Sequence, residues 1–272
     1  MSIFHLLLVA VVQGLTEFLP VSSSAHLILL PSLTGLEDQG QIIDVAAHIG
    51  TLGAVILYFW FDVKRVFIGV PRLLRWQIDG PEAWLALCLV IATIPVILFG
   101  LALKLSGYTD ALRSVTLIGA TMIGFGLLLY WFDQKGSYEK TAERWSLKDA
   151  LVMGLWQALA LIPGTSRSGI TITAARMLGY ARTDAARLSM LMSIPTIAAS
   201  GLLLGADVAI SGDTGTLRDL ALVIVMSFLA ALLALSLMMR LLKAFSYTPY
   251  VVYRIALGGF LLWYGLAGPA AA

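Results

Sequence analysis

The stretch Pro163-Gly164-Thr165-Ser166-Arg167-Ser168-Gly169 is a polar, charged island inside an otherwise apolar region. The apolar runs on either side of it, 150–162 and 170–178, are too short to cross a hydrocarbon core roughly 30 Å thick. They therefore predict a re-entrant hairpin that folds back at its tip. Lipid cannot satisfy a guanidinium at that depth, so protein or water should surround Arg167. The alternative is an arginine that snorkels to a membrane interface.

The composition is that of a polytopic membrane protein. Hydrophobic residues make up 59% of the 272 residues and charged residues 12%, with a mean hydropathy of +0.90. These values exclude an ordinary soluble domain, and the net charge of +2 gives no reason to expect nucleic acid as a partner. The single Cys88 cannot form an intramolecular disulfide. No Lys or Arg precedes Lys64, so a cleavable signal peptide is not expected and the first helix should be retained.

Apolar runs and helix breakers predict an all-α protein with about ten helical segments in two sets of five. The first set covers 3–19, 22–33, 42–61, 84–105 and 112–132, and the second covers 147–162, 168–178, 183–206, 217–242 and 247–266. Each set has a medium helix, a Pro and Ser turn, a short helix and three segments long enough to cross. We therefore expect one membrane domain, 1–272, with internal repeats at about 1–133 and 147–272 and a solvated loop at 133–149.

Basic residues predict how the repeats are oriented. If each first hairpin is re-entrant, three crossings per repeat invert the second copy, giving six transmembrane crossings in all. Fourteen of the 18 Lys and Arg, Arg254 among them, then fall on one side and three on the other, with Arg167 at a hairpin tip. The positive-inside rule places the basic side in the cytoplasm and both termini outside it. The two hairpin tips should meet near the bilayer midplane, where transporters with inverted repeats place their substrate sites.

The first hairpin carries polar groups that suit a functional site. Gln13 and Glu17 are four residues apart and share a helix face within an apolar run. A carboxylate there needs a partner, which could be Arg167 or a divalent cation bound by the Gln13 carbonyl and the Glu17 carboxylate. The alternative is that Glu17 lies at the membrane surface near the end of its helix.

Hydroxyl groups and helix starts indicate that this site binds phosphate. Pro20 ends the first helix, and the run 22–24 consists of three serines that can cap the next one. A second helix starts just after Thr165 and Ser166, so two positive helix ends and Arg167 could converge on one anion. His26 shares a helix face with Ser22 and Ser23, which makes it a candidate catalytic base, whereas a lone histidine is more often structural. We expect His5 to be interfacial and His48 to play at most a supporting role.

Several familiar signatures are missing. The sequence has no nucleotide-binding P-loop, no dinucleotide-binding glycine motif, no His-Glu-x-x-His and no paired cysteines. Fragments around Ser166-Arg167 and Ser24-Ala25-His26 faintly resemble lipid phosphatases of the phosphatidic-acid type. Those enzymes need a later histidine, and this chain has none after His48.

A closer resemblance rests on Gln13-Gly-Leu-Thr-Glu17-Phe-Leu-Pro-Val-Ser-Ser-Ser-Ala-His26 together with 163–169. These two regions resemble the signatures of the undecaprenyl-diphosphate phosphatase family, the bacitracin-resistance type of bacterial enzyme, and the similar layout covers essentially the whole chain. The resemblance implies a multi-pass protein of the cytoplasmic (inner) membrane with an active site open to the periplasm. It also implies that a divalent cation, magnesium or calcium, assists conversion of a C55 polyprenyl diphosphate to the monophosphate carrier lipid, for cell-wall lipid recycling.

The family motifs fall on particular residues of this chain. The Glu or Gln motif falls on Gln13 and Glu17, which would hold the metal, and the catalytic Ser and His fall on Ser23 and His26. Arg167 would clamp the terminal phosphate. Further contacts to phosphate would come from Ser22, Thr165, Ser166, Ser168 and Thr171. Ala25, Asp44 and His48 depart from the usual Gly, Glu and Gln, which puts a supporting role for the third helix in doubt.

Three functional hypotheses remain open from the sequence. The first is hydrolysis, either by Ser23 attacking phosphorus with help from His26 or by water that His26 and Glu17 activate. The second is a transporter or flippase of an anionic lipid, since inverted repeats with broken helices also describe those folds. A scaffold that only binds partners would leave the buried Glu17 and Arg167 unexplained. The oligomeric state stays open, with membrane lipids and the polyprenyl diphosphate as the expected partners.

Overall fold

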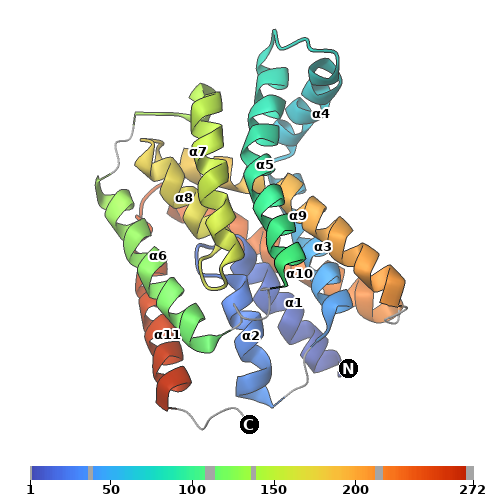
Figure 1. Ribbon diagram of the computed structural model, residues 1–272, viewed down its shortest axis with the longest axis vertical. Coiled ribbons are helices and arrows are strands. Elements are labelled where there is room, and N and C mark those ends of the chain that lie inside the picture. Colours follow the sequence, from blue (N-terminus) through green and yellow to red (C-terminus); the bar gives the residue numbers. More distant parts are fainter. Residues whose placement is uncertain (1, 36–38, 108–113, 136–138, 212–216, 268–272) are drawn as a thin grey trace.

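The computed structural model describes residues 2–35, 39–107, 114–135, 139–211 and 217–267. Within these ranges the chain forms eleven α-helices and no β-strand, which confirms the all-α prediction (Figure 1). The helices are α1 (Ile3–Glu17), α2 (Ser23–Thr34), α3 (Gln41–Tyr58), α4 (Trp60–Leu74), α5 (Pro81–Ser106), α6 (Val115–Lys135), α7 (Leu147–Ala158), α8 (Arg167–Met177), α9 (Arg182–Ser211), α10 (Leu217–Leu241) and α11 (Thr248–Ala267).

Six of the helices described are long and apolar enough to cross a membrane, as predicted. They are α3, α5, α6, α9, α10 and α11. The helices α1, α2, α7 and α8 have 15, 12, 12 and 11 residues, so an α-helical rise of about 1.5 Å per residue leaves each short of the hydrocarbon thickness. These four short helices form the two hairpins.

The helix α4 is absent from the sequence prediction, which gave about ten segments. The predicted helix 42–61 ends early at Tyr58, because Phe59 leaves the helical backbone conformation at φ −101° and ψ 31°. Lys64, Arg65 and Arg72 interrupt the apolar pattern that follows, so this segment reads as a polar connection. In the structure it is amphipathic, with Arg65 and Arg72 on one face and exposed apolar side chains such as Phe67 on another.

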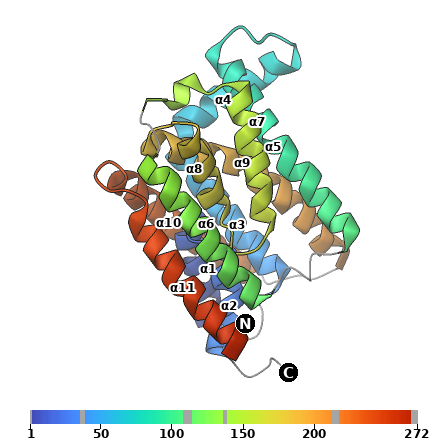
Figure 2. The same cartoon turned by 60° about the vertical axis from the view of Figure 1, so that its left-hand side comes forward.

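The short helices pack against long ones through close backbone approaches. The helix α1 lies against α10 and α3, and α7 lies against α5 and α8. A Cβ atom built on Gly14 would lie 2.6 Å from the Ser227 carbonyl oxygen, and one on Gly154 would lie 2.5 Å from the Ala92 carbonyl oxygen. Only glycine therefore permits these contacts, which are typical of helix pairs in membranes. The helices α6 and α11 run side by side along another face of the molecule (Figure 2).

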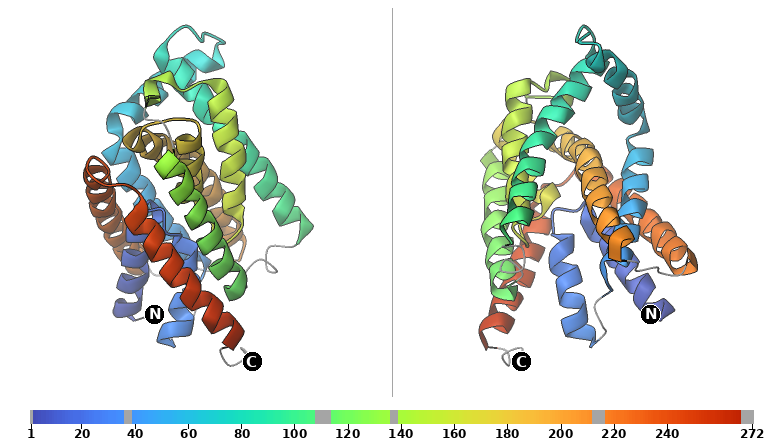
Figure 3. Two further views of the ribbon diagram at one scale, coloured as in Figure 1. Left: turned by 90° about the vertical axis from the view of Figure 1, so that its left-hand side faces the viewer. Right: turned by 45° about the vertical axis from the view of Figure 1, so that its right-hand side comes forward.

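Each hairpin turns near mid-height of the molecule, and the two enter from opposite ends (Figure 3). The α1–α2 turn covers residues 18–22, and the α7–α8 turn includes a short 3-10 helix at Leu159–Leu161. The N-caps of α2 and α8, Ser22 and Ser166, have φ values of 72° and 68°. Positive φ is costly for a residue with a side chain and concentrates at functional sites. The two turns therefore share one strained cap geometry.

The stretch 133–149, predicted to be a solvated loop, carries two buried carboxylates. The Asp133 side chain is fully buried and accepts a hydrogen bond from Arg182 Nε at 2.7 Å, with Arg176 Nε 3.3 Å away. Asp149 accepts a hydrogen bond from the Tyr180 hydroxyl at 2.6 Å. The prediction of a solvated loop is therefore wrong for Asp133 and Asp149. It was based on the charge of these residues, and the partners that bury them are more than thirty residues away in sequence. Residues 136–138 of this stretch lie outside the described ranges.

Candidate active site at the hairpin tips

The centre of the candidate site is the carboxylate of Glu17, the last residue of α1. Its Oε1 atom lies 2.7 Å from Arg167 Nη2, at the start of α8 and 150 residues away in sequence. Its Oε2 atom accepts hydrogen bonds from Gln13 Nε2 at 2.9 Å and from Ser23 Oγ at 2.8 Å. Glu17 is only 8% exposed. Of the two partners expected for this carboxylate, the structure gives the arginine, and it adds a serine hydroxyl.

Direct contacts hold the two hairpin tips together. Ser168 Oγ donates a hydrogen bond to the Leu19 carbonyl at 2.9 Å, so α8 is tied to the turn after α1. Ser166 Oγ accepts from the Gly169 backbone N–H at 3.1 Å and so caps α8, as the serine-rich pattern suggests. The first turns of α2 and α8 consequently lie at the same junction as Glu17 and Arg167. The backbone N–H groups at helix starts make such a junction suitable for an anion.

His26 does not take the position beside Ser23 that helix spacing suggested. Its Nδ1 atom lies 2.7 Å from the Ser22 carbonyl oxygen, and its Nε2 atom lies 2.5 Å from the Tyr253 hydroxyl oxygen. A carbonyl only accepts hydrogen bonds, so a neutral ring carries its proton on Nδ1 and accepts from Tyr253 at Nε2. The two rings are stacked, with centroids 5.6 Å apart. The side chain hydrogen-bonded to the Ser23 hydroxyl is Glu17.

The predicted phosphate-binding hydroxyls differ in their surroundings. Thr165 Oγ1 is buried and has no hydrogen-bond partner among the described residues, so it can still donate to a phosphate oxygen. Thr171 Oγ1 instead lies 2.8 Å from the Arg167 carbonyl and 2.6 Å from Ser189 Oγ. Ser22 Oγ and Ser24 Oγ are 3.2 Å apart. Thr165 therefore keeps an unused hydrogen-bond donor, while Thr171 supports the backbone beneath Arg167.

Sequence reasoning missed the role of Arg254, which it counted among the basic residues of the cytoplasmic side. Arg254 lies in α11, is fully buried, and donates hydrogen bonds to four backbone carbonyls. These belong to Met122 of α6, Pro20 of the first turn, and Gly164 and Thr165 of the second turn. One side chain thus joins both tips to the α6–α11 pair. The sequence feature that could have indicated this role is an arginine inside the apolar run that forms α11.

The residues expected to bind a metal fit a cation site only in part. The Gln13 Oε1 atom is buried and has no hydrogen-bond partner among the described residues, and Gln13 itself contacts the Glu17 carboxylate. Oxygen ligands of this kind suit magnesium or calcium. Among the described residues no group of three or more His, Cys, Asp or Glu is placed to hold a metal ion. Further ligands would have to come from substrate or water.

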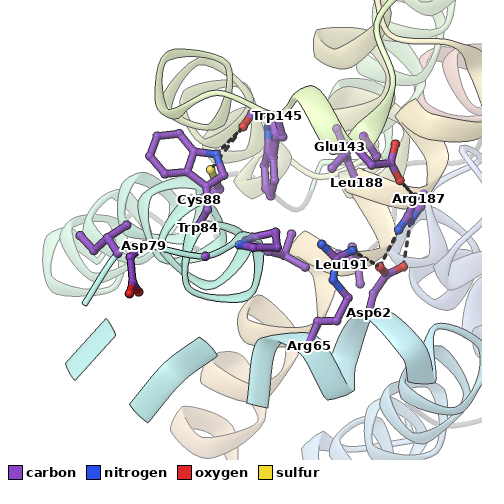
Figure 4. Close-up of a pocket in the computed structure, with 15 residues that line it drawn as sticks. Asp62, Arg65, Asp79, Trp84, Cys88, Glu143, Trp145, Arg187, Leu188 and Leu191 are labelled. Atoms are coloured by element: carbon purple, nitrogen blue, oxygen red, sulfur yellow. Dashed lines mark hydrogen bonds and ion pairs between the residues drawn. The ribbon is translucent and has the colours of Figure 1, made fainter. Parts of the chain in front are cut away.

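One further histidine lies near Glu17, whereas a well-formed cavity of the molecule lies elsewhere. His48 of α3 was expected to have at most a supporting role, and its Nε2 atom lies 3.9 Å from Glu17 Oε2. A cavity of about 420 Å³ lies apart from the hairpin tips, beside α4 and α5 (Figure 4). Arg187 lies at one side of that cavity and binds both Asp62 and Glu143, at 2.6 and 2.7 Å. None of the residues that line this cavity belongs to either hairpin tip, so it is not the candidate active site.

Fold and site together define an integral membrane protein whose polar centre lies where two helical hairpins meet. Comparison with known families identifies it further: a family model described as bacitracin resistance protein BacA matches residues 6–260, so the chain belongs to that family. This confirms the resemblance seen in the two sequence motifs.

Curated relatives are similar over nearly their whole length. A protein of Ruegeria pomeroyi is 65% identical over 262 residues, which cover 96% of this chain and 98% of the relative. A protein of Jannaschia sp. has the same identity and coverage, and one of Saccharophagus degradans is 44% identical over 269 residues, covering 97% of this chain and all of the relative. Each of the three is named undecaprenyl-diphosphatase.

Proposed function

We propose that this chain is a membrane phosphatase that hydrolyses undecaprenyl diphosphate to the monophosphate and inorganic phosphate. The observation that carries the proposal is the Glu17 carboxylate, which binds the Ser23 hydroxyl and the Arg167 guanidinium at once. A nucleophile, a proton acceptor and a phosphate-binding cation are thus within hydrogen-bond reach of one another. The printed names of the relatives support the same substrate. A transporter of an anionic lipid would need no hydroxyl paired with a carboxylate.

The geometry supports a serine route in which Glu17, rather than His26, is the base. Ser23 Oγ would attack the terminal phosphorus and pass its proton to Glu17 Oε2, 2.8 Å away. The bond from that phosphorus to the bridging oxygen breaks, and the lipid monophosphate leaves. Water then attacks the phosphoserine and releases inorganic phosphate. In the competing route, Glu17 takes its proton from water and Ser23 only positions the substrate.

The terminal phosphate would bind where the tips meet. Arg167 neutralises charge, Thr165 Oγ1 donates a hydrogen bond, and the backbone N–H groups at the starts of α2 and α8 face the same junction. Catalysis of phosphoryl transfer consists mostly of such positioning and neutralisation. When Arg167 binds phosphate, its contact with Glu17 weakens, which leaves the carboxylate freer to accept a proton.

A divalent cation, magnesium or calcium, is also part of the proposal. Gln13 Oε1 and the Glu17 carboxylate would hold it, and the unpartnered Gln13 oxygen supports this placement. The bound ion would neutralise charge on the diphosphate. This chain's own contribution is to orient Gln13 through its Nε2 hydrogen bond to Glu17.

We also propose a single membrane domain built of inverted repeats, 1–133 and 147–272, in the bacterial cytoplasmic membrane. The packing supports the repeats, because exchanging the helices of one half for those of the other converts the α1–α10 contact into α7–α5 and the α3–α10 contact into α9–α5. The basic bias is twelve to three once the fully buried Arg176 and Arg254 are removed from the surface count, and it still favours extracytoplasmic termini. Both hairpins would then be re-entrant, with the site open to the periplasmic side.

The test is phosphate release by the purified protein in detergent, with polyprenyl diphosphate and magnesium or calcium. Wild type should release phosphate, and Arg167→Ala should lower kcat/KM by about 100-fold or more, as expected for loss of a transition-state contact. Arg218→Ala, which alters an arginine at the start of α10, is the matched control and should behave like wild type. Absence of release from the wild type, or equal rates in both variants, would contradict the proposal.

A further inference from the structure

A second cavity of about 330 Å³ lies between α3 and α9, the helices at the right of Figure 1. Its walls are apolar except at His48, and include Ile49 and Leu52 of α3 and Ile197 and Leu202 of α9. Ile49 and Leu202 are 49% and 77% exposed. Both helices are candidate membrane spans, so this apolar groove would face the lipid. Its volume lies within the range of about 300–1,000 Å³ found for ligand pockets.

The groove is connected to the candidate active site through one residue. His48 lines the groove, and its Nε2 atom lies 3.9 Å from Glu17 Oε2. His48 Nδ1 is fixed by the Asp44 carbonyl at 2.7 Å, so the ring orientation is determined within α3. A ligand that reacts at Glu17 and carries an apolar chain would therefore find an apolar surface beginning next to its reacting group.

We infer that this groove binds the isoprenoid units of the substrate nearest to the diphosphate. The inference rests on the proposed function and extends it by assigning α3 and α9 to recognition of the chain. A prenyl chain is uncharged and branched, and the lining offers only aliphatic side chains beyond His48. His48 would lie at the boundary between the charged end of the ligand and its apolar chain.

The groove would orient the substrate more than it would increase hydrophobic burial. A prenyl chain already lies in lipid, which is as apolar as leucine, so its transfer into the groove gains little hydrophobic free energy. Fixing the first units of the chain nevertheless limits where the diphosphate can lie, and this positions its terminal phosphorus beside Ser23. Obstructing the groove should therefore impair long-chain substrates and spare those too short to reach it.

Gly201 offers a way to obstruct the groove without disturbing the helix packing. It lines the groove, and a Cβ atom built on it meets no other atom within 4 Å. Leucine is also a better helix former than glycine, by about 0.8 kcal/mol. Gly259 of α11 is the matched control, because its Cβ position is equally open and it lies outside the groove.

The experiment compares KM values for a long-chain polyprenyl diphosphate and for methyl diphosphate, which carries no isoprene unit and so cannot reach the groove. Gly201→Leu should raise KM at least tenfold for the long chain, a change of about 1.4 kcal/mol, and leave KM for the short one within twofold. Gly259→Leu should change neither value. Equal effects of Gly201→Leu on both substrates, or no effect on the long chain, would overturn the inference. If the wild type releases no phosphate from either substrate, it is the proposed function that fails.

A labelling experiment keeps the inference testable without turnover. A non-hydrolysable prenyl diphosphonate with a photoreactive diazirine on its first isoprene unit is irradiated with the wild-type protein in detergent. Peptides from 41–58 and 182–203 should be labelled, and excess long-chain prenyl diphosphate should prevent this labelling. Labelling confined to other helices would overturn the inference. So would labelling that a phospholipid displaces as well as the prenyl diphosphate does, because the groove would then hold any lipid chain.

Discussion

Replacing Arg254 by methionine should destabilise the protein and separate the hairpin tips. The side chain is fully buried, and among the described residues it forms no ion pair with a carboxylate. Its partners are the four carbonyls of Met122, Pro20, Gly164 and Thr165, at 2.9–3.3 Å. Methionine has a similar length but donates no hydrogen bond, so all four oxygens would lose this donor.

The expected magnitude follows from those contacts. The Met122 carbonyl keeps its intrahelical partner within α6, so three carbonyls, those of Pro20, Gly164 and Thr165, would be orphaned. An orphaned buried acceptor costs about 1–3 kcal/mol, so a value near the low end gives about 4 kcal/mol for the three. Removal of an unneutralised buried charge recovers part of this, which leaves about 3 kcal/mol. At about 2–4 °C per kcal/mol for a chain of this size, Tm in detergent should fall by about 6–12 °C.

Activity should change together with stability, because Pro20 and Gly164 belong to different hairpins and Arg254 bonds to both. We expect kcat for phosphate release to fall at least tenfold at a temperature where Arg254→Met is still folded. Arg254→Lys keeps the charge and three donors and should recover part of both losses. Gly259→Leu in the same helix is the control. An Arg254→Met protein with wild-type Tm and kcat would refute the assignment of Arg254 as the residue that joins the tips.

Three further predictions concern single contacts. Glu17→Gln should lower kcat by about 10²–10⁴-fold in steady-state phosphate release, because the amide cannot accept the Ser23 proton; a normal rate would remove Glu17 as the base. His26→Ala and Tyr253→Phe should each lower kcat, and the double variant should be no slower than His26→Ala, because the two side chains act as one pair; multiplied losses would contradict this. The hydrogen bond from Arg187 holds the pKa of Glu143 below its ordinary value of 4.5. The stability that this pair contributes is present above pH 4.5 and is lost as the pH falls through the lowered pKa of Glu143. Tm should therefore fall less on acidification in Glu143→Gln than in the wild type.

Much of the architecture could be predicted because a helix in a membrane must satisfy its backbone hydrogen bonds within itself. Length and apolar runs were enough to identify the six long helices, and proline and serine signals identified both hairpin turns. The helix α4 was missed for a specific reason. Its sequence has no long continuous apolar run, because basic residues interrupt it. Arg65 and Arg72 are separated from Phe67 only when the segment is helical and they lie on different faces.

The candidate site was predictable in composition but not in connectivity. Glu17, Ser23 and Arg167 stood out as polar residues in apolar surroundings, and the structure brings them within hydrogen-bond reach. Helix spacing suggested that His26 would face Ser23, yet its ring turns back to the Ser22 carbonyl and outward to Tyr253, whose position 227 residues away no local pattern encodes. Arg254 likewise gave no sign of its partners, because backbone carbonyls carry no sequence signature.

The central claim is that Ser23 and Glu17 form the reacting pair. The most direct measurement is rapid quenching of a single turnover with substrate labelled with ³²P in the terminal phosphate, in wild type, Ser23→Ala and Ser24→Ala. We expect a transient label on the wild-type protein at Ser23, the same label in Ser24→Ala, and neither label nor turnover in Ser23→Ala. Turnover at the wild-type rate in Ser23→Ala would contradict it.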